Sequence, residues 1–204
     1  MKLVRIILNR WARYSGRIRA RWYRWSFLFA ERPRHRRIEL GRDVAFLVPV
    51  RGGGQGSLRI GKGTSFGFPL AFRIGSGEIM LQARNPEAEI VIGENTVFSN
   101  NSVLCAVQSI RVGNQCRIGD SVSVIDADFH EIDPATRDRS VGVVKPVTIG
   151  NNVWIGSRTM VLKGASIGDN SVIGAMSLVA SPIPPNCVAA GVPARVIRQL
   201  EQRT

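Results

Sequence analysis

The clearest pattern in the chain is an aliphatic residue at every sixth position of its C-terminal part. Isoleucine or valine stands at positions 149, 155, 161, 167, 173 and 179, and glycine directly follows four of them. Small or β-branched residues precede each one by two positions. An earlier stretch has the same form, and its members are Ile92-Gly93, Phe98, Leu104, Val112-Gly113, Ile118-Gly119 and Val124, with weaker echoes at Ile60-Gly61 and Ile74-Gly75.

A period of six fits neither a helix, which repeats at 3.6 residues, nor a flat strand, which repeats at 2. It fits a three-sided solenoid in which each hexad forms one short strand and a corner, so that three hexads close a coil of about 18 residues. Successive coils stack at ~4.8 Å, with the aliphatic residues inside. Glycine and the Asn and Asp beside it suit corners with positive φ. We therefore expect an all-β parallel solenoid.

Four segments carry a family resemblance: TIGNNVWIGS, GASIGDNSVIGA, IPPN and AGVPARVIR. They resemble the hexapeptide-repeat acyltransferases, a left-handed parallel β-helix family, and are most similar to its maltose-, galactoside- and nodulation-type O-acetyltransferases and polysaccharide acetyltransferases. The resemblance covers residues 58–199 and is most specific over 145–199. It implies acetyl-CoA as acyl donor, a carbohydrate acceptor, and a homotrimer with active sites between subunits. The left hand rests on this resemblance alone, because parallel crossovers are otherwise right-handed.

The repeat is interrupted between Val124 and Ile149, where the spacing is 25 residues. Such excursions from a regular scaffold often carry sites. This one contains DADFHEID and, with it, His130, the only histidine outside the N-terminal segment. The resemblance implies that His130 is the general base, which takes the proton from a sugar hydroxyl as the hydroxyl attacks the acetyl thioester. The carboxylates that could orient its ring are Asp126, Asp128 and Glu131.

By the same resemblance, acetyl-CoA lies in a groove between neighbouring prisms. Trp154 packs near the pantetheine or acetyl end, although an interface role for this tryptophan is an alternative. Ser157 contacts the same end, Ala175 offers its amide, and N–H groups near Ser157 are expected donors to the oxyanion. The basic positions that would meet the CoA phosphates are Arg195 and Arg198.

Two further features concern binding. Ala180-Ser181 stands where relatives often have Thr-Lys, which removes a phosphate-binding lysine that Lys163 or Arg158 could replace. Asn100 and Asn101 match the region of acceptor-binding asparagines, and plain corner asparagines are the alternative.

The net charge of +13 is concentrated at the N-terminus. Residues 1–37 hold twelve Lys and Arg against one acid, whereas residues 38–204 hold sixteen against fourteen. Residues 1–29 form an amphipathic helical pattern whose apolar stripe is Val4, Ile7, Trp11, Tyr14, Ile18, Trp22, Trp25 and Phe29. Arginine beside tryptophan suits a helix at a membrane surface. Packing on the end of the solenoid and RNA binding are the alternatives, and residues 31–39 are expected to be a linker.

Other classes of protein are disfavoured. No run reaches the ~18–20 apolar residues of a membrane-spanning helix, and Arg5 and Arg10 interrupt the early apolar run, which argues against a secretory signal. Two histidines are too few for the three-histidine zinc site of a γ-type carbonic anhydrase, so no metal is expected. Cys105, Cys116 and Cys187 form no CxxC pair, which favours buried thiols in a reducing compartment.

The sequence therefore predicts a basic arm over 1–37, a left-handed β-helix acyltransferase domain over 38–199 and a tail over 200–204. The expected activity is acetyl-CoA-dependent O-acetyl transfer to a carbohydrate hydroxyl in surface polysaccharide or lipid-linked glycan synthesis. We expect a cytoplasmic homotrimer, without nucleic acid, that touches the inner face of the membrane through residues 1–29. An amino sugar or other small-molecule acceptor, and a non-catalytic scaffold, are the alternatives.

Overall fold

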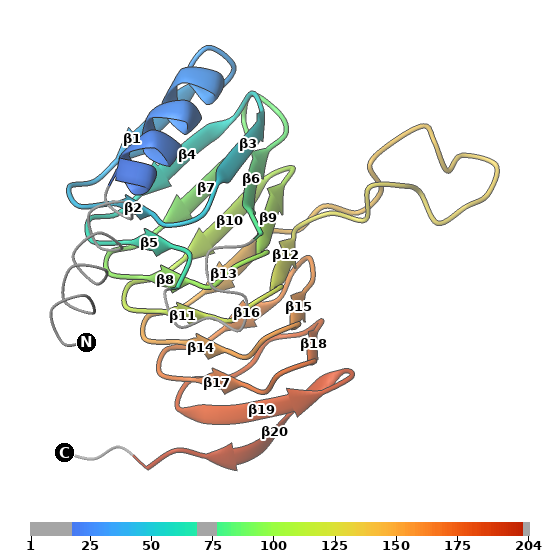
Figure 1. Cartoon of the computed structure of the whole chain (residues 1–204). Helices are drawn as coiled ribbons and strands as arrows, with labels where there is room; N and C mark the ends of the chain where they lie inside the picture. Colours follow the sequence, from blue (N-terminus) through green and yellow to red (C-terminus); the bar gives the residue numbers. More distant parts are fainter. Residues whose placement is uncertain (1–17, 69–76, 202–204) are drawn as a thin grey trace, which may run out of the picture.

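The computed structural model describes residues 18–68 and 77–201, which form twenty strands in three sheets and one N-terminal helix over residues 18–31 (Figure 1). The first sheet holds, in spatial order, β1 (Arg37–Leu40), β4 (Ser57–Ile60), β7 (Glu89–Ile92), β10 (Ser109–Val112), β13 (Val147–Ile149) and β16 (Ser166–Ile167). The second holds β2 (Ala45–Phe46), β5 (Ser65–Phe66), β8 (Val97–Phe98), β11 (Arg117–Ile118), β14 (Trp154–Ile155), β17 (Val172–Ile173), β19 (Cys187–Gly191) and β20 (Ala194–Gln199). The third holds β18 (Leu178–Val179), β15 (Met160–Val161), β12 (Ser123–Ile125), β9 (Val103–Ala106), β6 (Ile79–Ala83) and β3 (Val50–Gly54).

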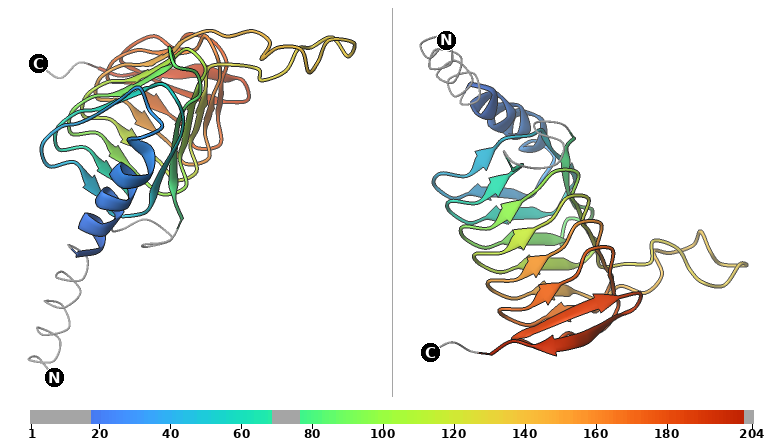
Figure 2. Two further views of the ribbon diagram at one scale, coloured as in Figure 1. Left: turned by 90° about the horizontal axis from the view of Figure 1, so that it is seen from above. Right: turned by 60° about the horizontal axis from the view of Figure 1, so that its bottom comes forward.

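Through β18, each sheet takes every third strand, so the chain visits the three sheets in turn and winds around a three-sided prism (Figures 1 and 2). All neighbouring strands are parallel except β19 and β20, which close the C-terminal end as an antiparallel pair. Aliphatic residues one coil apart, such as Ile149 and Ile167, are paired in register and buried. The predicted parallel β architecture with a helix ahead of it is confirmed, and the left hand of the coil remains an expectation of the resemblance.

The glycines that follow the aliphatic residues have a different role from the one expected. A Cβ on Gly156 would lie 2.5 Å from the Ala175 amide nitrogen, and one on Gly119 would lie 2.6 Å from that of Ser157. Positive φ occurs two residues after each of these glycines instead, at Arg158 (60°) and Ser121 (57°). These glycines are therefore required because adjacent coils approach too closely for a side chain, and not because of their own φ.

The helix covers the N-terminal end of the prism and extends an aromatic column inside it. Phe46, Phe66 and Phe98 lie on successive coils of the second sheet, with ring centroids 5.3 Å apart at each step. Phe46 meets Phe66 edge-on, and Phe66 stacks on Phe98. Phe27 of the helix meets Phe46 edge-on at 5.2 Å and is 1% exposed. In the described part of the chain, no helix is long and apolar enough to cross a bilayer.

The expectation that residues 31–39 form a linker is wrong. Glu31 and His35 are buried, with 3.5 Å between Glu31 Oε2 and His35 Nε2, and His35 Nδ1 lies 3.1 Å from the Gly56 carbonyl oxygen. Strand β1 then begins at Arg37. The turn after the helix is thus packed against the first coil, which ties the helix to the solenoid.

Candidate active site

Residues 126–146 leave the prism between β12 and β13 and project away from it (Figure 1). They emerge at the edge that joins the third sheet to the first. The two ends of this loop are held together by an antiparallel bridge between Ala127 and Val144 and by a 2.9 Å hydrogen bond from the Lys145 amide to the Asp126 carbonyl. The base of the loop is therefore a short two-stranded stem, and His130 lies just beyond it.

Asp126 anchors this stem to the preceding coil. Its carboxylate is fully buried and accepts hydrogen bonds from the backbone amides of Val107, Gln108 and Ser109 at 2.7–2.8 Å. Three charge-assisted bonds compensate the loss of water around a buried carboxylate. Asp126 is thus committed to holding the loop, and not to the His130 ring.

The other two carboxylates proposed for orienting His130 also have different partners. Asp128 forms an ion pair with Lys163, and Glu131 accepts a hydrogen bond from the Ser140 hydroxyl. The acidic group at the ring is Asp138, whose Oδ1 lies 3.3 Å from His130 Nδ1. The His130 side chain is 63% exposed, so it is open to an incoming substrate.

The backbone at His130 is shaped by two contacts that the sequence did not indicate. Phe129 has a φ of 67°, which is costly for a side chain of this size. The Arg84 guanidinium, from the corner after β6, lies 4.5 Å from the centre of the Phe129 ring. On the other side, Gly142 has a positive φ and packs so closely on the His130 carbonyl that a Cβ there would overlap it. Arg84 and Gly142 therefore hold the turn that presents His130.

Three of the residues predicted to hold acetyl-CoA, Trp154, Arg195 and Arg198, lie on the second sheet. Trp154 of β14 is exposed, and its register runs through Val172 of β17 and Val188 of β19 to Arg198 of β20. Because paired residues point to the same face of a sheet, these four side chains form one outward row. Three strand spacings of ~4.8 Å separate its ends by about 14 Å. Arg195 is also exposed on β20, paired with Ala190.

Ser157 and Ala175 occupy equivalent corners of successive coils, after β14 and β17. One coil earlier, the Asp120 amide is capped by the Ser157 hydroxyl at 3.2 Å. At another edge, the same kind of cap joins the Asn151 amide to Asp169 at 2.7 Å. Ala175 has no side-chain oxygen with which to cap the Ser157 amide. At this corner, the Asp120 amide is therefore capped by a side chain from the next coil, whereas the Ser157 amide is not.

The two asparagines proposed for acceptor binding differ in exposure. Asn100 is fully buried in the corner after β8, and its carbonyl accepts a 2.9 Å hydrogen bond from the Ser121 amide. Asn101 has a φ of 60° and donates to Asp120 at 3.2 Å. Of these two asparagines, Asn101 is the one that is partly exposed.

The three cysteines are buried. Burial raises the pKa of the Cys105 and Cys116 thiols, although Arg84 opposes the shift at Cys105 and the Val153 backbone does so at Cys116. A raised pKa makes a thiol a poor nucleophile. Within the described residues, no group of three His, Cys, Asp or Glu side chains is placed to hold a metal ion.

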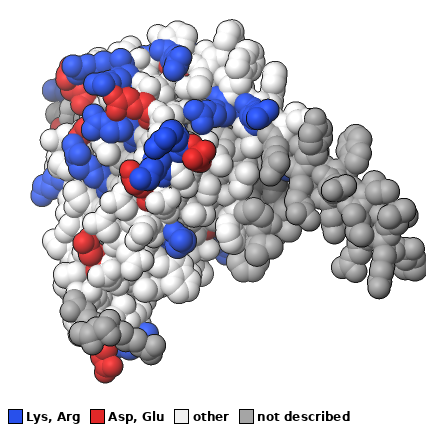
Figure 3. All heavy atoms as spheres, turned by 90° about the vertical axis from the view of Figure 1, so that its left-hand side faces the viewer, with Lys and Arg blue, Asp and Glu red and all other residues white. Residues whose placement is uncertain are grey.

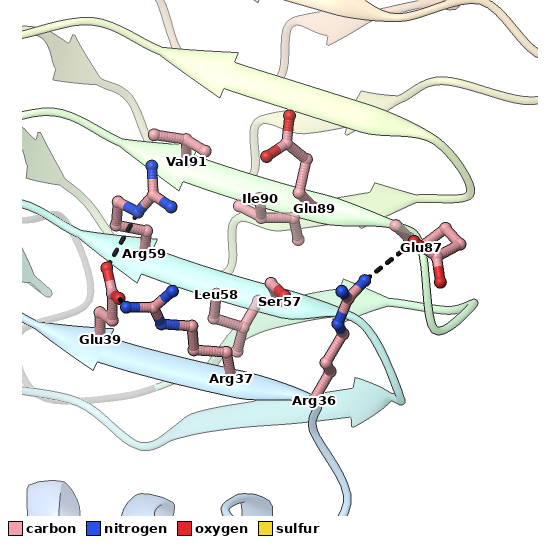
Figure 4. A pocket seen from close by; sticks show the side chains of 11 residues that line it. Arg36, Arg37, Glu39, Ser57, Leu58, Arg59, Glu87, Glu89, Ile90 and Val91 are labelled. Carbon is pink, nitrogen blue, oxygen red and sulfur yellow. Dashed lines mark hydrogen bonds and ion pairs between the residues drawn. The ribbon is translucent and has the colours of Figure 1, made fainter.

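A hollow of about 310 Å³ lies elsewhere, on the outer face of the first sheet (Figure 4). Its arginines are paired with acids: Arg36 with Glu87 at 2.8 Å and Arg59 with Glu39 at 2.9 Å. Figure 3 shows this mixing of charges toward the end of the molecule that carries β1 and β4. Because these cations are paired and far in the fold from His130, we do not place the active site there.

Within a single chain, the predicted site residues do not lie in one place. The His130 loop leaves at the edge between the third and first sheets. Trp154 and Arg198 lie on the second sheet, and Ser157 lies at the edge between the second and third sheets. The residues predicted for catalysis and for coenzyme binding thus lie on different sides of the prism.

Residues 146–181 match the family model described as bacterial transferase hexapeptide (six repeats). The galactoside O-acetyltransferase of Escherichia coli (strain K12) is 41% identical over 116 residues, which is 57% of each chain. Among solved structures, a galactoside acetyltransferase in complex with coenzyme A is 34% identical, with a TM-score of 0.56 over 74% of this chain and 66% of that one. A hexapeptide-repeat-containing acetyltransferase of Vibrio cholerae O1 biovar eltor, complexed with acetyl coenzyme A, is 26% identical, with a TM-score of 0.57 over 80% of this chain and 72% of that one.

The matches in sequence are partial, since the chain spans 57% of the length of the Escherichia coli protein. The family-model match lies in the solenoid, where the hexad pattern is strongest. The resemblance found in the sequence is thereby confirmed: this chain carries the bacterial transferase hexapeptide repeat, and its solenoid is similar to that of acetyltransferases solved with coenzyme A or acetyl coenzyme A.

Proposed function

We propose that this protein is an acetyl-CoA-dependent O-acetyltransferase that acts on a carbohydrate hydroxyl. The observation that carries the proposal is the outward row from Trp154 to Arg198 on the second sheet, together with Ser157 in the corner that follows β14. An aromatic surface suits the thioester arm, and arginines about 14 Å away suit the phosphates. Acetyl-CoA and a sugar acceptor are also consistent with the names of the similar proteins.

The reaction requires one proton to move twice. His130 takes the hydroxyl proton of the acceptor while the hydroxyl oxygen bonds to the thioester carbonyl carbon. The carbon–sulfur bond then breaks, and the imidazolium returns the proton to the departing thiolate of CoA. Asp138 holds Nδ1, so Nε2 is the nitrogen left to face the acceptor. The acetyl group passes directly to the acceptor, because the three cysteines are buried and out of reach of the thioester.

The oxyanion formed during the attack needs hydrogen-bond donors. The proposed donor is the amide of Ser157, which the Ala175 side chain cannot cap and which lies three residues after Trp154 in the corner that follows β14. A fixed backbone N–H at this position contributes about 10²–10³ in rate when it is aimed at the oxyanion. Asn101, the more exposed of the two candidate asparagines, is the proposed contact for the acceptor.

Residues on different sides of one prism can form this site only if two chains contribute to it. In the cyclic homotrimer that we propose, the His130 loop of each chain would lie against the second sheet of the next chain, which would satisfy this requirement. The projecting loop of residues 126–146 supports this arrangement, since it extends well beyond its own prism (Figure 1). The left-handed coil expected from the resemblance belongs to the same proposal.

Replacement of His130 tests the mechanism. Transfer to a galactoside, followed as thiol release from acetyl-CoA, should fall by about 10²–10⁴ in His130→Ala. Acetyl-CoA binding measured by calorimetry should not change, since His130 takes the proton of the acceptor and is not among the residues proposed to hold the coenzyme. Arg139→Ala, an exposed change in the same loop, is the matched control and should retain activity. Wild-type transfer by His130→Ala would contradict the mechanism, and a wild-type protein that binds no acetyl-CoA would favour the scaffold alternative.

A further inference from the structure

The N-terminal helix has one face that packs on the solenoid and an opposite face that is exposed. Phe27 is buried against Phe46, and Tyr23 and Leu28 pack partly against the same core. Because these residues cover the end of the prism, the helix already has its intramolecular contact. Any large apolar side chain on its other side is left without one.

Four such side chains are present: Ile18, Trp22, Trp25 and Phe29. Each is between 55% and 72% exposed. Trp25 stacks on Trp22 at 5.3 Å and on Phe29 at 5.2 Å, so the side chains form one continuous stripe. At 3.6 residues per turn, all four lie roughly 140–200° around the helix from Phe27. The stripe is therefore on the side of the helix opposite Phe27, which packs on the solenoid; Figure 2 shows the helix at the N-terminal end of the prism.

The charges around the stripe favour an anionic surface. Arg19 and Arg21 are exposed and lie on either side of it around the helix. Residues 1–37 carry twelve Lys and Arg against the single acid Glu31, which is buried. This excess of about +11 opposes stripe-to-stripe contact with a second copy of the chain. Tryptophan in the centre with arginine at the sides is typical of a helix that lies in the headgroup region of a bilayer.

We propose that residues 18–31 dock on an anionic bilayer through this stripe, with Arg19 and Arg21 on the headgroups. Because the stripe is opposite the capping face, docking stands the prism on the membrane. From β2 to β14 there are four strand spacings of ~4.8 Å, which places Trp154 about 19 Å from the capped end. Resting on the proposed function, this height selects an acceptor whose sugar stands away from the bilayer, as in a lipid-linked oligosaccharide.

The test is co-sedimentation of the full chain with vesicles. Wild type should sediment with phosphatidylcholine–phosphatidylglycerol vesicles, much less with phosphatidylcholine alone, and less as salt is raised. The double variant Trp22→Gln/Trp25→Gln should bind at least about tenfold more weakly. Ile197→Gln, which removes an exposed apolar side chain at the other end of the molecule, is the control and should bind like wild type.

Three results would overturn the proposal: no sedimentation of wild type, equal sedimentation of the double variant, or an effect confined to self-association or RNA binding. The thermal unfolding midpoint of the double variant should match that of wild type, because both tryptophans are exposed. Calorimetry with acetyl-CoA on the same samples separates this test from that of the proposed function. If the double variant loses vesicle binding and still binds the coenzyme, the result supports docking. If wild type binds vesicles but not acetyl-CoA, the result counts against the acetyltransferase assignment only.

Discussion

At the scale of single residues, the reactivity of the proposed base depends on side chains that hold its loop. His130 is exposed and its one acidic neighbour, Asp138, is exposed as well. A pair so open to water contributes little by charge alone. The position of the ring is therefore set by the backbone beneath it, where Phe129 has a positive φ and stacks under Arg84.

We predict that Arg84→Ala lowers kcat by about tenfold, because the loss of a cation–π contact lets the turn before His130 relax. The KM for acetyl-CoA should not change, since Arg84 is not on the coenzyme row. Arg84→Lys retains a cation over Phe129 and should recover most of the loss. Steady-state thiol release measures kcat and the KM for acetyl-CoA in wild type and in both variants. An effect on KM alone, or no recovery by lysine, would show that Arg84 does not position His130 through Phe129.

His130 could be predicted from the sequence, because it is a lone histidine in a break of a regular repeat. Asp138 and Arg84 could not. Asp126, Asp128 and Glu131 are nearer in sequence, but each finds another partner once the loop folds back on its stem. Which carboxylate meets the ring depends on the turn at residues 133–139, and no periodic pattern describes that turn.

At the scale of elements, the N-terminal helix and the aromatic column form one packing unit. Phe27 adds a fourth ring to the column of Phe46, Phe66 and Phe98. A solenoid needs its terminal coil covered, since the last coil otherwise exposes its apolar interior. The helix supplies that cover, and the buried Glu31–His35 contact fixes its end.

We predict that Phe27→Ala lowers the free energy of unfolding by about 3–5 kcal/mol, because it opens a cavity over Phe46. Phe29→Ala removes the same side chain two residues along the helix from an exposed site and should change it by less than about 0.5 kcal/mol. Urea unfolding followed by circular dichroism measures the difference. Equal effects of the two changes would mean that the helix does not cap the prism through Phe27.

The hexad series predicted the strands well, because each aliphatic position is set by burial inside the prism. The first two coils, from Arg37 onward, are harder to recognise in the sequence, since Phe46 and Phe66 occupy positions where the C-terminal coils have isoleucine. The apolar stripe of the helix could be predicted from its spacing, but the residue that contacts the solenoid could not. That residue is Phe27, which lies outside the stripe and packs on Phe46.

At the scale of the whole molecule, the residues proposed for the active site lie on different sides of the prism, so they do not meet within one chain. The His130 loop, the Ser157 corner and the Trp154–Arg198 row lie on different edges and faces. The sequence places these residues in order along the chain but cannot show which edge each one occupies, because that requires the register of the coils. The proposed trimer would join the loop of one chain to the row of the next.

Mixed trimers test this account most directly. His130→Ala chains lack the base, and Trp154→Ala/Arg198→Glu chains lack the coenzyme row, so each should be inactive alone at low acetyl-CoA. After co-refolding in equal amounts, about a quarter of the interfaces should pair an intact loop with an intact row, and thiol release should recover to about a quarter of the wild-type rate. Mixed trimers that are verified by native mass spectrometry and still show no activity would contradict a site shared between chains.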